Sequence, residues 1–138
     1  MTITDFINGI AEKCVELIPN VTIYLDEVEQ NMQVPAVFIK IRNYAETKVN
    51  GKNRYRDDIE VLIKYIPSDT DNASSECFGL LEDFEDLVEF IPFDNDEIMG
   101  KGIESNVTDG ILNTYVNYSV FVYKVAEKDP LMQKLDIK

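Results

Sequence analysis

The chain has 138 residues, of which 45% are hydrophobic, and a formal net charge of -13 at pH 7. This length and composition predict one folded domain with a substantial core and exclude a disordered chain. The negative charge disfavours non-specific binding to nucleic acids and to anionic membranes, because both repel an acidic surface. The sequence contains no apolar run long enough to span a membrane and no recognisable signal peptide. We therefore expect a cytoplasmic protein.

The first third of the chain predicts one helix followed by two strands. Apolar residues recur at three- and four-residue spacing through residues 2–18, which is typical of an amphipathic helix, and Pro19 ends it. Alternating apolar and polar residues predict a short strand at 21–25 and a longer strand at 34–44. Residues 46–53 contain an Asn-Gly pair and predict a hairpin connection.

The middle of the chain predicts a long strand and a second helix. Residues 55–66 alternate between apolar and charged side chains, and Pro67 ends this strand. Residues 77–91 carry an apolar stripe at helical spacing with acids around the remainder. We expect this helix to be closed by Pro92.

Two more strands are predicted before the end of the chain. The first covers residues 98–107 and is expected to bend or bulge at residues 100–102, which include two glycines. An Asp-Gly pair at 109–110 is a strong turn signal, and the last strand runs from about residue 111 to 124.

The predicted element order is α-β-β-β-α-β-β, which favours the α+β fold class. We expect a mainly antiparallel sheet with the two amphipathic helices packed on one face. Residues 1–124 would form this single domain, and residues 125–138 a C-terminal arm that is mobile or docks elsewhere.

Charge is divided unevenly along the chain. Residues 40–56 contain six bases and one acid, whereas residues 76–97 contain nine acids and no base. Opposite-signed patches suit head-to-tail contact between copies, although a plain solvated helix face explains the acids equally well. The residues predicted at such a subunit interface are Lys48, Lys52, Arg54, Arg56, Glu82, Asp83, Glu85, Asp86 and Glu89.

The sequence predicts no catalytic residues, no cofactor site and no metal site, and we expect the protein not to be an enzyme. It lacks histidine, the commonest general base and metal ligand. Cys14 and Cys77 fall on apolar helix faces and are expected to be buried free thiols. Acidic runs that begin at Asp69 and Asp94 lack the glycine and the bidentate acid of a calcium-binding loop.

Several segments resemble the small tail terminator proteins of phages and prophages of Gram-positive bacteria. They are Tyr24–Gln30, Val34–Ile39, Asn53–Arg56, Ile59–Pro67 and Asp109–Leu112, together with the acidic second helix. The resemblance extends to about Lys124 and lies in the pattern of elements and turns, with no catalytic signature.

This resemblance implies a fold like that of the tail terminator of phage lambda and a ring, typically a hexamer, on the finished tail tube. Such a ring stops tube polymerisation and offers a docking surface for the head connector, while DNA passes through its lumen. The expected partners are other copies of the chain, the tail tube protein and the head connector. The protein would be assembled in the host bacterial cytoplasm and reside in the virion.

Two alternatives remain open at this point. The first is another neck component, such as a head–tail adaptor or a tail completion protein, which the sequence barely separates from a terminator. The second is an acidic inhibitor that mimics DNA. A DNA mimic needs a dispersed acidic surface, and the bases of residues 40–56 argue against it.

Overall fold

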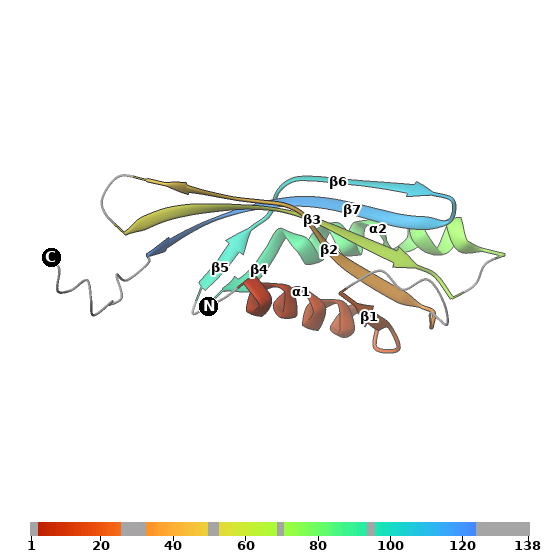
Figure 1. The fold of residues 1–138 in the computed structure, drawn as a ribbon. Coiled ribbons are helices and arrows are strands. Elements are labelled where there is room, and N and C mark those ends of the chain that lie inside the picture. The colour runs from red at the N-terminus through yellow and green to blue at the C-terminus, as the bar shows by residue number, and fades with distance from the viewer. Residues whose placement is uncertain (1–2, 26–32, 50–52, 69–70, 94–95, 124–138) are drawn as a thin grey trace, which may run out of the picture.

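The protein folds into a five-stranded sheet with two helices on the same side of it (Figure 1). This computed structural model describes residues 3–25, 33–49, 53–68, 71–93 and 96–123. In chain order its elements are α1 (Ile3–Leu17), β1 (Thr22–Tyr24), β2 (Ala36–Lys48), β3 (Arg54–Ile66), α2 (Ala73–Glu89), β4 (Phe90–Phe93), β5 (Asp96–Met99), β6 (Lys101–Thr108) and β7 (Ile111–Tyr123). The predicted α+β class is confirmed, and the predicted arm at 125–138 lies outside the described residues.

The large sheet has the strand order β1-β2-β3-β7-β6, and only the β1–β2 pairing among its strands is parallel. Asp109 and Gly110 both have positive φ, of 56° and 74°, and join β6 to β7 in a tight hairpin. This is the backbone geometry that an Asp-Gly pair favours. The predicted turn is therefore confirmed.

The core lies between the sheet and the helices. Alternate residues of β3 and β7 face the helices and are buried, as period-two patterning requires. From α1 the buried side chains are Phe6, Ile10 and Cys14, and from α2 they are Cys77, Phe84, Leu87 and Val88. The Phe6 ring meets the Tyr118 ring edge-on, with centroids 4.9 Å apart. The predicted apolar stripes thus form the core.

The end of α2 differs from the prediction. The helix stops at Glu89, and Ile91 belongs to β4, so the expected helix through residue 91 is wrong. Pro92 has no N–H to offer the carbonyl of Val88, so the helix cannot continue its hydrogen bonds there. Instead, the Tyr118 hydroxyl donates to the Val88 oxygen at 2.6 Å, and the Gly100 N–H donates to the Glu89 oxygen at 2.7 Å. Donors that are distant in sequence therefore satisfy carbonyl groups at the end of the helix.

The expected strand at 98–107 is two strands. β5 pairs with β4 in a separate two-stranded sheet, and β6 pairs with β7 in the large one. Gly100 lies at the break, where an added Cβ would come within 2.6 Å of both Val116 Cγ2 and the Val88 oxygen. The pairing register shifts between Lys101 and Glu104. The predicted bend is confirmed, but the two halves serve different sheets.

One end of the large sheet continues beyond the helices as three strands, β2, β3 and β7 (Figure 1). β1 pairs with β2 only as far as Phe38, and β6 pairs with β7 only between Ile111 and Asn117. β2 continues to Lys48, four residues further than expected, and β3 begins at Arg54, so the two ends of the predicted 46–53 hairpin lie at the tip of this end. Residues 50–52 of that prediction lie outside the described residues. We call these three strands, beyond the helices, the projecting end.

Candidate assembly surfaces

The helix layer carries half of the described acids and only one base. Helices α1 and α2 together contain nine acids, and their one base is Lys13. The acids are Asp5, Glu12 and Glu16 on α1, and Glu76, Glu82, Asp83, Glu85, Asp86 and Glu89 on α2. The Lys13 amine donates to the Phe90 oxygen at 2.7 Å, just past the end of α2. Sequence analysis identified the acids of α2 but missed those that α1 adds to the same layer.

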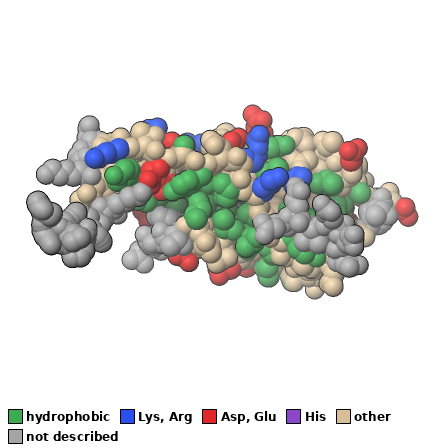
Figure 2. Space-filling view, viewed as in Figure 1, with side chains coloured by type: hydrophobic (Ala, Val, Ile, Leu, Met, Phe, Trp, Pro, Cys, Tyr) green, Lys and Arg blue, Asp and Glu red, His purple; other side chains and the backbone are tan. Residues whose placement is uncertain are grey.

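The large sheet has a different charge balance. Its strands contain seven bases and five acids, and none of these is on β7. The bases are Lys40, Arg42, Lys48, Arg54, Arg56, Lys64 and Lys101, and the acids are Glu46, Asp57, Asp58, Glu60 and Glu104. In Figure 2 the Lys and Arg side chains in view lie on the sheet half of the molecule, and the charge along the lower edge is acidic. Charge is therefore divided between layers as well as along the sequence.

The predicted basic residues lie on both sides of the projecting end. Lys48 is exposed and pairs with Tyr55, so it shares the helix-facing side of the sheet. Arg54 and Arg56 lie on the opposite side, and Lys52 is outside the described residues. The Arg54 guanidinium lies over the Phe121 ring, 4.5 Å from its centroid. The described basic residues of this prediction therefore point to two opposite sides of the sheet.

Arg56 belongs to a small polar network on the outer side of the sheet. Its Nε lies 3.1 Å from Asp58 Oδ2, and the Ser119 hydroxyl donates to Asp58 Oδ1 at 2.6 Å. The hydrogen bond from Ser119, and to a smaller extent Arg56, lowers the pKa of Asp58. Sequence analysis assigned no role to Ser119, since no local pattern indicates that it lies opposite Asp58.

A second polar pair lies on the helix-facing side of the projecting end. The Tyr44 hydroxyl donates to Asp57 Oδ2 at 3.0 Å. Burial, followed by this hydrogen bond, raises the pKa of Tyr44 to about 12. Tyr44 reaches this side because the β2–β3 register shifts between Ile41 and Asn43, which reverses the alternation of β2.

The predicted acidic residues are all on α2. Glu82, Asp83 and Asp86 are exposed, whereas Glu85 and Glu89 are half-buried. Helix α2 packs against β6 and β7, whereas α1 contacts β1 and β2. Because β2 and β7 lie on opposite sides of β3, the acidic helix and the basic strand β2 lie on opposite flanks of the molecule. The structure therefore places the two charged sets apart within one chain.

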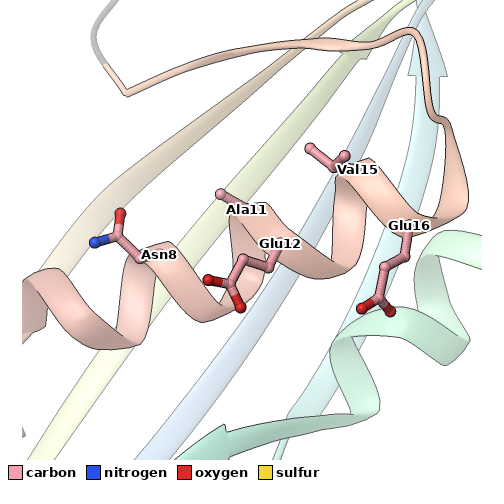
Figure 3. A pocket seen from close by; sticks show the side chains of 5 residues that line it. All are labelled: Asn8, Ala11, Glu12, Val15 and Glu16. Carbon is pink, nitrogen blue, oxygen red and sulfur yellow. The ribbon is translucent and has the colours of Figure 1, made fainter.

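Two surface hollows border α1. One, of about 370 Å³, lies between the helices, and its lining residues are Lys13, Glu16, Leu17, Asp83, Asp86 and Leu87. The other, of about 520 Å³, is lined entirely by α1 residues, namely Asn8, Ala11, Glu12, Val15 and Glu16. Figure 3 shows the two glutamates of this second hollow pointing away from the other three side chains. Side chains that diverge in this way do not converge on a ligand or reacting atom.

The described residues offer little for chemistry. No group of three or more Cys, Asp or Glu among them is placed to hold a metal ion. Cys14 and Cys77 are buried and free, as predicted, and burial raises the pKa of Cys14 to about 12. A raised thiol pKa disfavours the reactive thiolate. No helix in the described part of the chain has the length and apolar character needed to cross a membrane.

Comparison with known proteins gives the family. The model of a family described as phage tail terminator protein matches residues 5–130, which is most of the chain. A search of curated proteins finds no match. The matched range includes α1 from Asp5 onward, the whole of α2 and every strand from β1 to β7. The chain therefore belongs to the phage tail terminator family.

Proposed function

We propose that this protein forms a ring on the end of the phage tail tube and acts by assembly, without catalysing a reaction. The resemblance implies six copies in the ring. The ring stops further polymerisation of the tube and presents the surface to which the head joins. The match of the tail terminator family over residues 5–130 carries this proposal. The oppositely charged flanks of the chain support it, because they suit repeated contact between identical copies.

A closed ring needs two different lateral surfaces on each copy. The contact is heterologous, so one flank of each copy meets the other flank of its neighbour. Strand β2 carries Lys40, Arg42 and Lys48, and α2 carries its acids on the opposite flank. Charge complementarity of this kind sets the register of a contact and rejects wrong partners more than it adds affinity.

The overall charge adds a condition on assembly. Each copy carries a net charge of -13, so copies in free solution repel one another. We propose that the end of the tail tube acts as a template that offsets this repulsion. An acidic lumen would also let DNA slide through without binding.

Electron microscopy of particles from a phage that lacks this gene tests the proposal. A terminator predicts overlong tails, because nothing stops addition of tube subunits. Tails of normal length that fail to join heads would contradict the proposal and indicate a head–tail adaptor instead. A complementing copy of the gene is the control, since it should restore both tail length and joining.

A further inference from the structure

The projecting end has two outer strand edges. Among the described residues, no strand pairs with the outer side of β2 beyond Phe38 or with the outer side of β7 beyond Asn117. We call Asn43–Lys48, the part of β2 after the register shift, the β2 edge, and Tyr118–Tyr123 the β7 edge. Each is six residues, or roughly 20 Å of strand at about 3.3 Å per residue.

The β7 edge has none of the protective residues that edge strands of monomeric proteins normally carry. Such strands carry charged side chains, proline or a covering segment that blocks pairing with another chain. Strand β7 contains no charged residue and no proline among its 13 residues. The strand that could have covered it, β5, leaves the large sheet at Gly100 and pairs with β4 instead. Within the described part of the chain, the fold therefore leaves a neutral edge with which no strand pairs.

The hydrogen bonds between β2 and β3 show which backbone peptide groups point outward from the sheet. The Val49 N–H donates to the Arg54 oxygen at 2.9 Å, so the peptide groups of Val49 and Arg54 point toward each other. Directions alternate along an antiparallel strand, so the peptide groups of Tyr44 and Lys48 point away from β3. By the same alternation across β3, those of Ser119 and Phe121 point away from β3 on the other side.

We propose that neighbouring copies in the ring join their sheets, the β7 edge of one copy pairing with the β2 edge of the next. This inference rests on the proposed ring. Both β2 and β7 are antiparallel to β3, so they run in the same direction. Rotation about a ring axis preserves a strand's direction along that axis, so the new junction is parallel. A two-fold dimer would instead place identical edges antiparallel.

The charges on the two flanks agree with this junction. Because α2 packs under β6 and β7, a β2 strand added beyond β7 arrives on the acidic flank. Arg42, which directly precedes the β2 edge, then lies nearer to the end of α2 than Lys48 does, because the projecting end continues past the helices. Strand β7 itself is neutral, so the junction places no like charges directly opposite each other. Backbone pairing would supply the contact, and the charges would set its direction.

Proline substitutions at outward-facing peptide groups test the junction. Tyr44→Pro and Phe121→Pro each remove an N–H that points to the partner copy and leave the ladder with β3 complete. Tyr44→Ala and Phe121→Ala remove the same side-chain contacts but keep the N–H. We expect the proline variants to stay monomeric and folded by circular dichroism, and to complement the gene deletion at least tenfold less well than the alanine variants. Equal complementation by folded proline and alanine variants would overturn the proposal.

Disulfide trapping gives a second readout that does not depend on proline. Thr47 and Phe121 both pair with Arg56 in one sheet, so they lie at the same level on opposite edges. On isolated tails under oxidation, the double variant Thr47→Cys/Phe121→Cys should give disulfide-linked dimers, trimers and larger species on a non-reducing gel. Each single variant should stay unlinked. Dimers from a single variant would indicate a two-fold contact and overturn the parallel junction. Rings on tails in which the double variant forms no disulfide-linked species would overturn the junction but leave the proposed function intact. Tails of normal length without this protein would refute the function itself.

Discussion

Replacement of Gly100 by alanine tests how the structure separates its two sheets. An alanine Cβ at this position would lie 2.6 Å from Val116 Cγ2 and 2.6 Å from the Val88 carbonyl oxygen. The carbonyl already accepts the Tyr118 hydroxyl and belongs to the end of α2, so it cannot move without disturbing that contact. Overpacking of this kind typically costs about 1–3 kcal/mol. We expect Gly100→Ala to lower the free energy of unfolding by this amount.

Gly79 provides a matched control for the same substitution. It lies within α2, and an added Cβ there would meet no heavy atom within 4 Å. Alanine at such a helical position stabilises by roughly 0.5–1 kcal/mol relative to glycine. Urea unfolding followed by circular dichroism should therefore show changes of opposite sign in the free energy of unfolding of the two variants. The slope of that free energy against urea concentration should be unchanged. A Gly100→Ala variant as stable as the wild type would refute the close packing at this break.

Three further predictions concern the core, the polar network and the thiols. Tyr118→Phe should cost about 1–3 kcal/mol of unfolding free energy in urea titrations, because it leaves the buried Val88 oxygen without its donor; a smaller loss would contradict this. Ser119→Ala should raise the pKa of Asp58 toward its ordinary value in an NMR titration, because the Ser119 hydrogen bond is the main cause of the lowered pKa. Since the folded-state pKa is lowered, the stability from this network is present above the ordinary value of 3.8 and is lost as pH falls through the folded-state value; an unchanged Asp58 titration would contradict the assignment. Cys14 and Cys77 should resist labelling by a thiol reagent at neutral pH until the protein is unfolded, and rapid labelling of the folded protein would show that they are accessible.

Local patterns were sufficient to predict most elements of this fold. The three- and four-residue spacing of α1 and the strict alternation of β3 and β7 each reflect one buried face, which sequence records directly. The Asp109-Gly110 turn was predictable because few residues adopt positive φ at both central positions. Free, buried cysteines followed from their places on the apolar stripes.

Features that depend on distant contacts could not be predicted in this way. The end of α2 is fixed by donors from Tyr118 and Gly100, and neither is near it in sequence. Apolar residues at 90–93 fit a helix or a strand equally well until β5 is placed opposite them. The separation of bases and acids along the sequence was visible. Which flank of the molecule each set occupies depends on the strand order, which places β2 and β7 on opposite sides of β3. The acids of α1 join the same layer only because both helices cover one side of the sheet.

A charge exchange between the two flanks tests the central claim most directly. Lys48→Glu/Lys52→Glu reverses the hairpin charge, and Glu82→Lys/Glu85→Lys reverses acids of α2 that do not line the hollow facing α1. Complementation of the gene deletion, scored as the tail-length distribution in electron micrographs, would be compared for each pair and for the combined variant. We expect each pair alone to give overlong tails and the combination to restore normal length, because the attraction between flanks returns with its signs exchanged. Normal tails from each separate pair, or no recovery in a folded combined variant, would contradict contact between these surfaces.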